Sequence, residues 1–191
     1  YDTKFLPPMF TEKVGQLRKI GPVLDYCLVG HMGEGKNVEL VIEAFIELYK
    51  RGSKAQITFY GGSEERLAEL QNQYDLPPTI HFKGIVNEVP YHLHQCYLSA
   101  SYTELFANAC VEALNQGLLA LLSDVDIAHR FYAGQSNAIN LFKTKSELIQ
   151  KIEEMEQPDF CLLNEKNLAL ASRYSLEKVA QIYRELLDRN F

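Results

Sequence analysis

Short apolar runs alternate with amphipathic helical patterns over most of the chain. Runs with strand character cover residues 24–29, 56–60, 79–83, 97–100 and 118–123, with a weaker one at 138–142. Helices are predicted over 108–116, from Ser63, and along the face formed by Val38, Val41, Ile42, Phe45 and Leu48. This alternation predicts an α/β fold in which helices cover both faces of a parallel sheet. Ligands of such sheets bind beyond the carboxyl ends of the strands.

The beginning of the chain lacks this pattern. Residues 1–22 contain three prolines, Pro7, Pro8 and Pro22, and show little periodicity. We therefore expect an extended segment or interdomain linker there, followed by one folded domain over residues 23–191. Because the chain starts with Tyr1 and not with methionine, we expect it to be a piece or a processed product of a longer protein.

The last third of the chain is predicted to be helical. Ser146 and Ser175 are candidate caps for two of its helices. The second of these helices carries an apolar stripe made of Val179, Ile182, Tyr183, Leu186 and Leu187.

Composition and charge narrow the range of partners. The 191 residues are 47% hydrophobic, and no apolar run is long enough for a membrane span or a signal peptide, so we expect a cytoplasmic protein. The formal net charge of −6 gives no attraction to nucleic acid, and an anionic ligand would have to be held by a few placed cations and backbone N–H groups. The four cysteines are scattered without paired spacing, which predicts reduced, buried, structural thiols.

The loop over residues 30–37 is the first candidate site. It contains Gly30, Gly33 and Gly35, ends in Lys36, and lies between a predicted strand and a predicted helix. Glycines allow close approach of the backbone, and the helix N-terminus and the lysine supply positive charge, so the loop suits a diphosphate. It matches neither the Walker nor the dinucleotide pattern, and a flexible loop with a solvated lysine is an equal alternative.

Residues 30–44 resemble, without gaps, a segment of family 4 glycosyltransferases that runs from Gly-Arg through Lys-Gly to a helix ending in Glu-Ala. In that family the arginine and the lysine hold the diphosphate of the sugar donor. The resemblance therefore assigns Gly30, His31 and Lys36 to diphosphate binding. His31 replaces the arginine, and a neutral imidazole offers one hydrogen bond where arginine offers a fixed charge and a bidentate fork.

Two further loops are similar to the same family. Gly61 lies in a glycine-rich turn after the second strand, where a simple tight turn is the favoured alternative. Residues 82–86 resemble the Phe-x-Gly-x-Val segment whose backbone lies against the nucleobase in the family. The resemblance thus implies base contacts from Gly84, Ile85 and Val86.

The strongest similarity is a pair of glutamates, Glu104 and Glu112, separated by seven residues. In the family the second glutamate binds the ribose and the first contacts the sugar, so Glu112 is the implied ribose ligand and Glu104, with Lys36, the implied catalytic group. Backbone amides where this helix begins, those of Phe106, Ala107 and Asn108, are implied ligands of the sugar donor. The alternative is that both glutamates are ordinary surface charges.

The glutamate segment also departs from the family. Leu105 and Ala107 stand where glycines usually flank the phenylalanine. A side chain there narrows the space for the sugar donor and disfavours positive φ, so we expect altered donor preference or slower turnover.

Metal and cofactor chemistry is not expected. Asp124 and Asp126 form an Asp-x-Asp pair, but we assign them to turn and cap duty, with Mg²⁺ binding as the weaker alternative. His92 and His94 show the closest spacing among the histidines, and solvated or core positions are favoured for all of them.

Taken together, the resemblance implies a Rossmann-like domain that forms one half of a GT-B architecture. It would bind a UDP-sugar, while an N-terminal domain missing here would bind a glycan or lipid-linked acceptor and could bring the protein to the inner face of the membrane. The implied reaction is hexose transfer with retention and without metal, and we expect this piece alone to be inactive. A non-catalytic nucleotide-binding or partner module and a nucleotide-sugar epimerase remain alternatives.

Overall fold

The computed structural model describes residues 19–174, 177–178, 180–181 and 184–185. The predicted linker up to residue 18, the cap at Ser175 and the apolar stripe after it lie outside the described residues.

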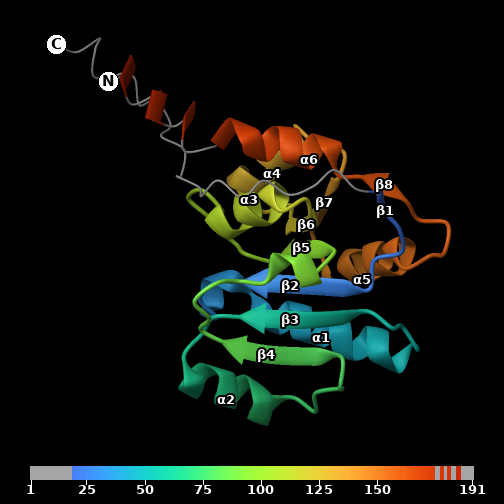
Figure 1. The fold of residues 1–191 in the computed structure, drawn as a ribbon. Coiled ribbons are helices and arrows are strands. Elements are labelled where there is room, and N and C mark those ends of the chain that lie inside the picture. Colours follow the sequence, from blue (N-terminus) through green and yellow to red (C-terminus); the bar gives the residue numbers. More distant parts are fainter. Residues whose placement is uncertain (1–18, 175–176, 179, 182–183, 186–191) are drawn as a thin grey trace.

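Six parallel strands form the centre of the molecule, in the order β4-β3-β2-β5-β6-β7 (Figure 1). They are β2 (Asp25–Val29), β3 (Gln56–Tyr60), β4 (Ile80–Gly84), β5 (Cys96–Ser99), β6 (Leu119–Ser123) and β7 (Ile139–Phe142). The parallel sheet is confirmed, and each predicted strand lies within one residue of the observed one. The sequence order reverses between β2 and β5, the place where ligands of open α/β sheets bind.

Helices cover both faces of the sheet, as predicted. They are α1 (Val38–Lys50), α2 (Glu64–Gln73), α3 (Asn108–Asn115), α4 (Ile127–Ala133), α5 (Lys145–Met155) and α6 (Glu165–Ala171). Short 3-10 turns are η1 (Glu34–Lys36), η2 (Tyr91–Leu93) and η3 (Ser172–Tyr174). Buried residues of α1, α2 and α5 pack in one core, and those of α3, α4 and α6 pack in a second.

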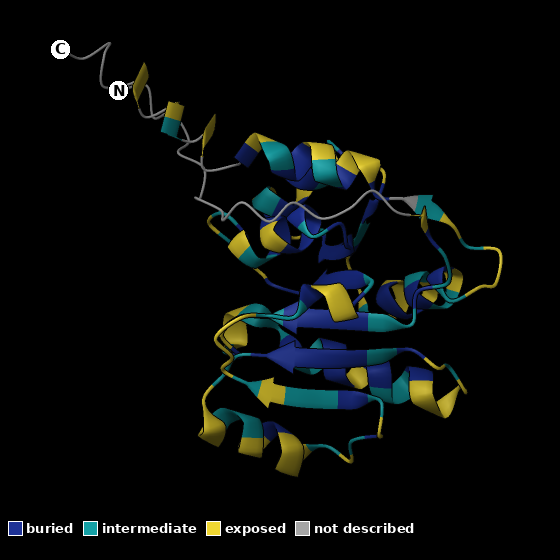
Figure 2. Cartoon of the chain, viewed as in Figure 1, coloured by how far each residue is buried: buried dark blue, intermediate teal, exposed yellow. Residues whose placement is uncertain are grey.

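The alternation of side chains along the strands explains the two cores. In β6, Leu119 and Leu121 point into the core of α1 and α5, whereas Ala120 and Leu122 point into that of α3 and α6. The central strands are therefore buried on both sides (Figure 2), which is why their sequence reads as continuous apolar runs.

A short two-stranded sheet lies beside the main one. In it, β1 (Lys19–Ile20) pairs antiparallel with β8 (Leu162–Leu163). Ile20 is buried in the first core, so ordered packing begins before Val23, where the sequence predicts the folded part to start. A strand of two residues is too short to show a periodic pattern.

The helix caps differ from the prediction at one place. Ser63 accepts a hydrogen bond from the Arg66 N–H at 3.3 Å and caps α2, as predicted. The α5 prediction is wrong, because the cap is Thr144, whose hydroxyl accepts from the Glu147 N–H at 3.2 Å, and Ser146 lies inside the helix. Both residues are good caps by type, but Glu147 follows Thr144 at the capping-box spacing, a signal in the sequence that favours Thr144.

The cysteines are free, and three of them, Cys27, Cys96 and Cys110, are buried, as predicted. Cys161 is exposed, which corrects the prediction for that residue. None of the helices in the described part of the chain combines the length and apolar character that crossing a bilayer requires.

Candidate functional site

The loops that follow the strands meet at the carboxyl edge of the sheet. The Gly30 N–H donates to the Tyr60 carbonyl at 3.0 Å, and the Gly61 N–H donates to the Gly84 carbonyl at 2.6 Å. In the loop after β5, the Tyr102 N–H donates to the Gly35 carbonyl at 2.9 Å. The glycine loops singled out in the sequence are thus joined to one another, although they lie far apart in the chain.

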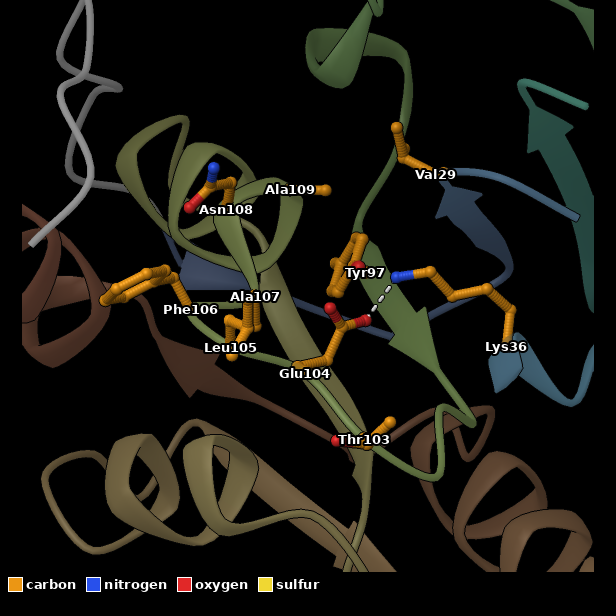
Figure 3. A pocket seen from close by; sticks show the side chains of 11 residues that line it. Val29, Lys36, Tyr97, Thr103, Glu104, Leu105, Phe106, Ala107, Asn108 and Ala109 are labelled. Atoms are coloured by element: carbon orange, nitrogen blue, oxygen red, sulfur yellow. Dashed lines mark hydrogen bonds and ion pairs between the residues drawn. The ribbon is translucent and has the colours of Figure 1, made fainter. Parts of the chain in front are cut away.

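A cavity of about 510 Å³ opens at this edge (Figure 3). Its volume lies in the usual range for small-molecule sites. Six of the sequence-predicted residues line it, namely Gly30, Lys36, Glu104, Phe106, Ala107 and Asn108. The other lining residues are Val29, Tyr97, Thr103, Leu105 and Ala109.

Lys36 and Glu104 both line this cavity and form an ion pair with each other (Figure 3). Their side chains are 26% and 14% exposed, so the pair is partly shielded from water. Glu104 Oε1 also accepts a hydrogen bond from the Ser101 hydroxyl at 2.8 Å. Lys36 is brought here by η1, after which Asn37 takes a left-handed conformation (φ 50°) and starts α1.

The N-terminus of α3 forms another wall of the cavity. Ala107 precedes this helix with φ 47°, a left-handed conformation that glycine adopts more readily. The N–H groups of Asn108 and Ala109 lie in the first turn, where a helix offers no carbonyl acceptor of its own. Both residues line the cavity, so the helix end presents partial positive charge there.

Glu112 lies farther along α3, outside the cavity lining and on an exposed part of the helix. The buried Tyr91 donates its hydroxyl hydrogen to Glu112 Oε2 at 3.1 Å, with the Ala109 carbonyl as a second neighbour at 3.4 Å. Partial loss of hydration raises the pKa of the Glu112 carboxyl above its ordinary value, and the Tyr91 hydrogen bond opposes this rise. The carboxylate is therefore oriented from one side and open to solvent on the other.

The remaining predicted residues are not among those that line the cavity. Ile85 and Val86 follow β4 and are 82% and 36% exposed. His31 is exposed, and its Nδ1 accepts a hydrogen bond from the Gly33 N–H at 3.1 Å. This bond turns Nδ1 toward the histidine's own loop.

Comparison with known proteins identifies the family. The family model of the glycosyl transferases group 1 matches residues 10–170. The chain belongs to this family.

Individual relatives of this group 1 domain are distant. It is 25% identical over 175 residues to the alpha-monoglucosyldiacylglycerol synthase of Acholeplasma laidlawii, covering 85% of this chain and 44% of the relative. It is 26% identical over 166 residues to the GtfA subunit of the UDP-N-acetylglucosamine–peptide N-acetylglucosaminyltransferase of Limosilactobacillus reuteri, covering 80% of this chain and 32% of the relative. The chain thus spans less than half of either relative.

Solved structures show the same fold. Anabaena HepE in complex with UDP and glucose has a TM-score of 0.72 at 16% identity, over 88% of this chain and 49% of that one. Pneumococcal GtfA in complex with UDP and GlcNAc has a TM-score of 0.70 at 17% identity, over 88% of this chain and 36% of that one. The group 1 domain described here therefore has the Rossmann-like fold of GT-B glycosyltransferases.

The Asp-x-Asp pair of this group 1 domain is engaged in structural contacts. Asp124 Oδ1 accepts from Arg130 Nε at 2.8 Å and Oδ2 lies 3.3 Å from Lys143 Nζ. The Arg130 guanidinium, followed by Lys143, lowers the pKa of the Asp124 carboxyl. Asp126 caps α4 by accepting from the His129 N–H at 3.1 Å, the cap duty that the sequence predicts. Within the described ranges, no three His, Cys, Asp or Glu side chains are grouped as a metal site requires.

Sequence reasoning missed three residues that support the site. Ser101 and Asp126 both contact Glu104, and Tyr91 contacts Glu112. These contacts join residues from different loops. A glutamate three residues after Ser101 was the one local signal that could have indicated such a contact.

Proposed function

We propose that this chain is the sugar-donor half of a retaining glycosyltransferase, which transfers a hexose from a UDP-sugar to a glycan or lipid-linked acceptor without a metal ion. The observation that carries this proposal is the convergence of Lys36, Glu104 and the N-terminus of α3 on one cavity. These groups have the chemistry that a sugar diphosphate needs, because a cation and backbone N–H groups face a carboxylate that accepts from hydroxyls.

Charge develops on the departing diphosphate when the glycosidic bond of the donor breaks. Lys36 and the N–H groups of Asn108 and Ala109 would stabilise this charge from fixed positions, as electrostatic catalysis requires. They would thereby take the place of a metal ion. Glu104 would accept hydrogen bonds from the sugar hydroxyls, and Glu112 from those of the ribose.

When the diphosphate enters, Lys36 has either to bind the phosphate and Glu104 at the same time or to break its ion pair with Glu104. Lys36 would then turn to the phosphate oxygens, and Glu104, still held by Ser101, would be released to the sugar. Binding of the diphosphate would in this way also free the Glu104 carboxylate to bind the sugar.

The names of the relatives support a UDP-sugar and leave the acceptor class broad. One relative is named for a peptide acceptor and another for a diacylglycerol product. Two solved neighbours hold UDP together with a sugar.

A non-catalytic nucleotide-binding module is the second candidate. Three observations favour it: the orientation of His31 toward its own loop, the 85% exposed side chain of Leu105 at the cavity, and an alanine in left-handed conformation at position 107. Such a module would bind UDP tightly and give no transfer in the full-length protein. An activity assay on the full-length protein with UDP-glucose and UDP-N-acetylglucosamine separates the two candidates.

Calorimetric titration of this chain with UDP, GDP and uridine tests the nucleotide site. We expect Lys36→Met to weaken UDP binding about tenfold to hundredfold, since a charge-assisted hydrogen bond contributes about 1.5–3 kcal/mol, and to leave uridine binding unchanged. Lys50→Met, an exposed lysine at the end of α1, is the matched control. Equal UDP affinity of Lys36→Met and wild type would contradict the site.

A further inference from the structure

The buried carboxylate of Asp126 contacts the loop that carries Glu104 and lines the cavity. Asp126 is 4% exposed and lies between β6 and α4. Its Oδ2 accepts a hydrogen bond from the backbone N–H of Glu104 at 2.6 Å, and its Oδ1 accepts from the backbone N–H of His129 at 3.1 Å. One side chain therefore joins the first turn of α4 to the loop that carries Glu104.

Two hydrogen bonds in series also connect the end of β6 to the side chain of Glu104. Ser123, at the end of β6, donates its hydroxyl hydrogen to the Ser101 carbonyl at 2.5 Å. Ser101 in turn donates its hydroxyl hydrogen to Glu104 Oε1 at 2.8 Å. Both the backbone and the side chain of Glu104 are thus held from the end of β6, by groups that are almost fully buried.

The chemistry of position 126 requires a carboxylate. Two backbone N–H groups approach it from different segments, and an ionised carboxylate is acceptor-only, with an oxygen for each. Asparagine has one acceptor oxygen and would turn its NH₂ group toward one of the two N–H donors. Serine can still cap α4, but its side chain is too short to reach Glu104 as well.

The neighbouring Asp124 shows the contrast. It is paired with the exposed cations Arg130 and Lys143, whereas the two oxygens of Asp126 accept from backbone N–H groups. Asp126 therefore binds two chain segments, the first turn of α4 and the loop with Glu104, and this loop lines the cavity.

We propose that Asp126 is a positioning residue for the sugar site: it fixes the backbone of Glu104, and thereby the direction in which the Glu104 carboxylate meets the hexose of a UDP-sugar. This inference rests on the proposed function, because it takes the contact between Glu104 and the sugar from there. It adds that the second aspartate of the Asp-x-Asp pair acts on the sugar site through its hydrogen bond to the Glu104 backbone, and not by binding a metal ion.

The substitution Asp126→Ser tests this role, since it keeps the cap of α4 and removes the bond to Glu104. The probes are UDP, UDP-glucose and UDP-N-acetylglucosamine, titrated calorimetrically into this chain. We expect the affinity for the UDP-sugar that wild type binds more tightly to fall about threefold to tenfold, the effect of losing roughly one hydrogen bond. The affinity for UDP, which lacks the hexose, should stay within a factor of two.

Amide hydrogen exchange provides a readout that needs no ligand. The Glu104 N–H should exchange at least about tenfold faster in Asp126→Ser, because its acceptor is gone. Asp126→Thr, whose hydroxyl can also cap α4 but is too short to reach the Glu104 N–H, is the second variant in case serine prevents folding. In a Glu104→Ala background, Asp126→Ser should no longer change the ratio of UDP-sugar to UDP affinity.

Thr144→Ala is the matched structural control, because it removes a helix cap whose hydrogen bond, to the Glu147 N–H of α5, involves neither Glu104 nor Asp126. It should lower stability without changing the affinity ratio. Equal changes in UDP and UDP-sugar affinity in Asp126→Ser, or unchanged exchange of the Glu104 amide, would overturn the inference. If wild type binds none of the three ligands, the proposed function fails instead, and the exchange experiment still tests the bond between Asp126 and Glu104.

Discussion

At the scale of single residues, Gly61 shows how closely the loops of the site approach each other. Its φ is +104°, and a Cβ at this position would lie 2.3 Å from the Gly30 carbonyl oxygen. Gly52 also has a positive φ, +86°, but a Cβ there meets nothing within 4 Å. Substituting the two glycines by alanine therefore separates two contributions to the loss of stability. One is the strain of a left-handed backbone conformation, and the other is the steric clash between the two loops.

We expect Gly52→Ala to lower the free energy of unfolding by about 1–2 kcal/mol through the left-handed conformation alone. Gly61→Ala should cost about 1–3 kcal/mol more, because the Gly30 loop has to move. Urea unfolding of both variants gives the difference directly, and UDP affinity should fall only in Gly61→Ala. Equal destabilisation would show that the loops are not in contact.

Glu112, the proposed ribose ligand, shows how the protonation of one carboxyl changes stability with pH. Its pKa is raised in the folded protein, so folding binds a proton more tightly at this carboxyl. The stability that Glu112 contributes is present below its ordinary pKa and is lost as the pH rises through the raised value. In Glu112→Gln this loss is absent, so from pH 4 to pH 7 the variant should gain stability relative to wild type.

Glu65 is the control of opposite sign for this experiment. Its own backbone N–H and the Ser63 hydroxyl lower its pKa, so its contribution is present at neutral pH and is lost as the pH falls through the folded value. Glu65→Gln should therefore lose stability relative to wild type as the pH rises. Unfolding free energies measured at several pH values test both signs, and parallel curves for the two variants would contradict the assignment of Glu112.

At the scale of elements, the start of α5 gives a direct test of a helix cap. Thr144→Ala removes the hydroxyl that accepts from the Glu147 N–H and should lower the free energy of unfolding by about 1 kcal/mol. Ser146→Ala changes a residue inside the helix and should be neutral or slightly stabilising, since alanine is the better helix former. Thermal unfolding of the two variants checks this order, and the reverse order would place the cap at Ser146.

The elements also show which parts of the fold a sequence can reveal. The four inner strands, β3, β2, β5 and β6, were predictable because they are largely buried on both faces and read as mainly apolar runs. The edge strands β4 and β7 are only partly buried, and their signal in the sequence is correspondingly weaker. The two-residue strand β1 and its partner β8 were not, because their pairing joins residues far apart in the chain, such as Lys19 and Leu163, and leaves no local pattern.

The same distinction applies to the site. Lys36 and Glu104 were predictable individually, from loop composition and family resemblance, and the structure brings them together in one cavity. Their ion pair was not predictable, and neither was the bond from Glu104 to Asp126, 22 residues away, nor that from Tyr91 to Glu112, 21 residues away. Such contacts depend on how neighbouring strands place their loops, which becomes known only with the complete sheet.

At the scale of the whole molecule, the cavity is bounded by one domain only. Three of the most exposed apolar side chains, those of Ile85, Leu105 and Ile127, follow the carboxyl ends of β4, β5 and β6 at the edge where the cavity opens. The relatives are more than twice as long as the part matched here, and their remaining residues are available to cover this edge. We infer that a group 1 domain alone leaves a bound sugar in contact with water.

We therefore expect the 191-residue chain to bind UDP but to transfer no sugar. Transfer requires an acceptor held in line with the sugar and a site from which water is excluded, and a single open wall provides neither. Incubating the chain with a radiolabelled UDP-sugar and a glycan or lipid-linked acceptor should give no labelled acceptor, whereas titration shows UDP binding. The full-length protein, assayed in parallel, should form product if it is catalytic and none if it is a binding module. Transfer by the isolated chain would mean that Lys36, Glu104 and the end of α3 form a complete active site by themselves.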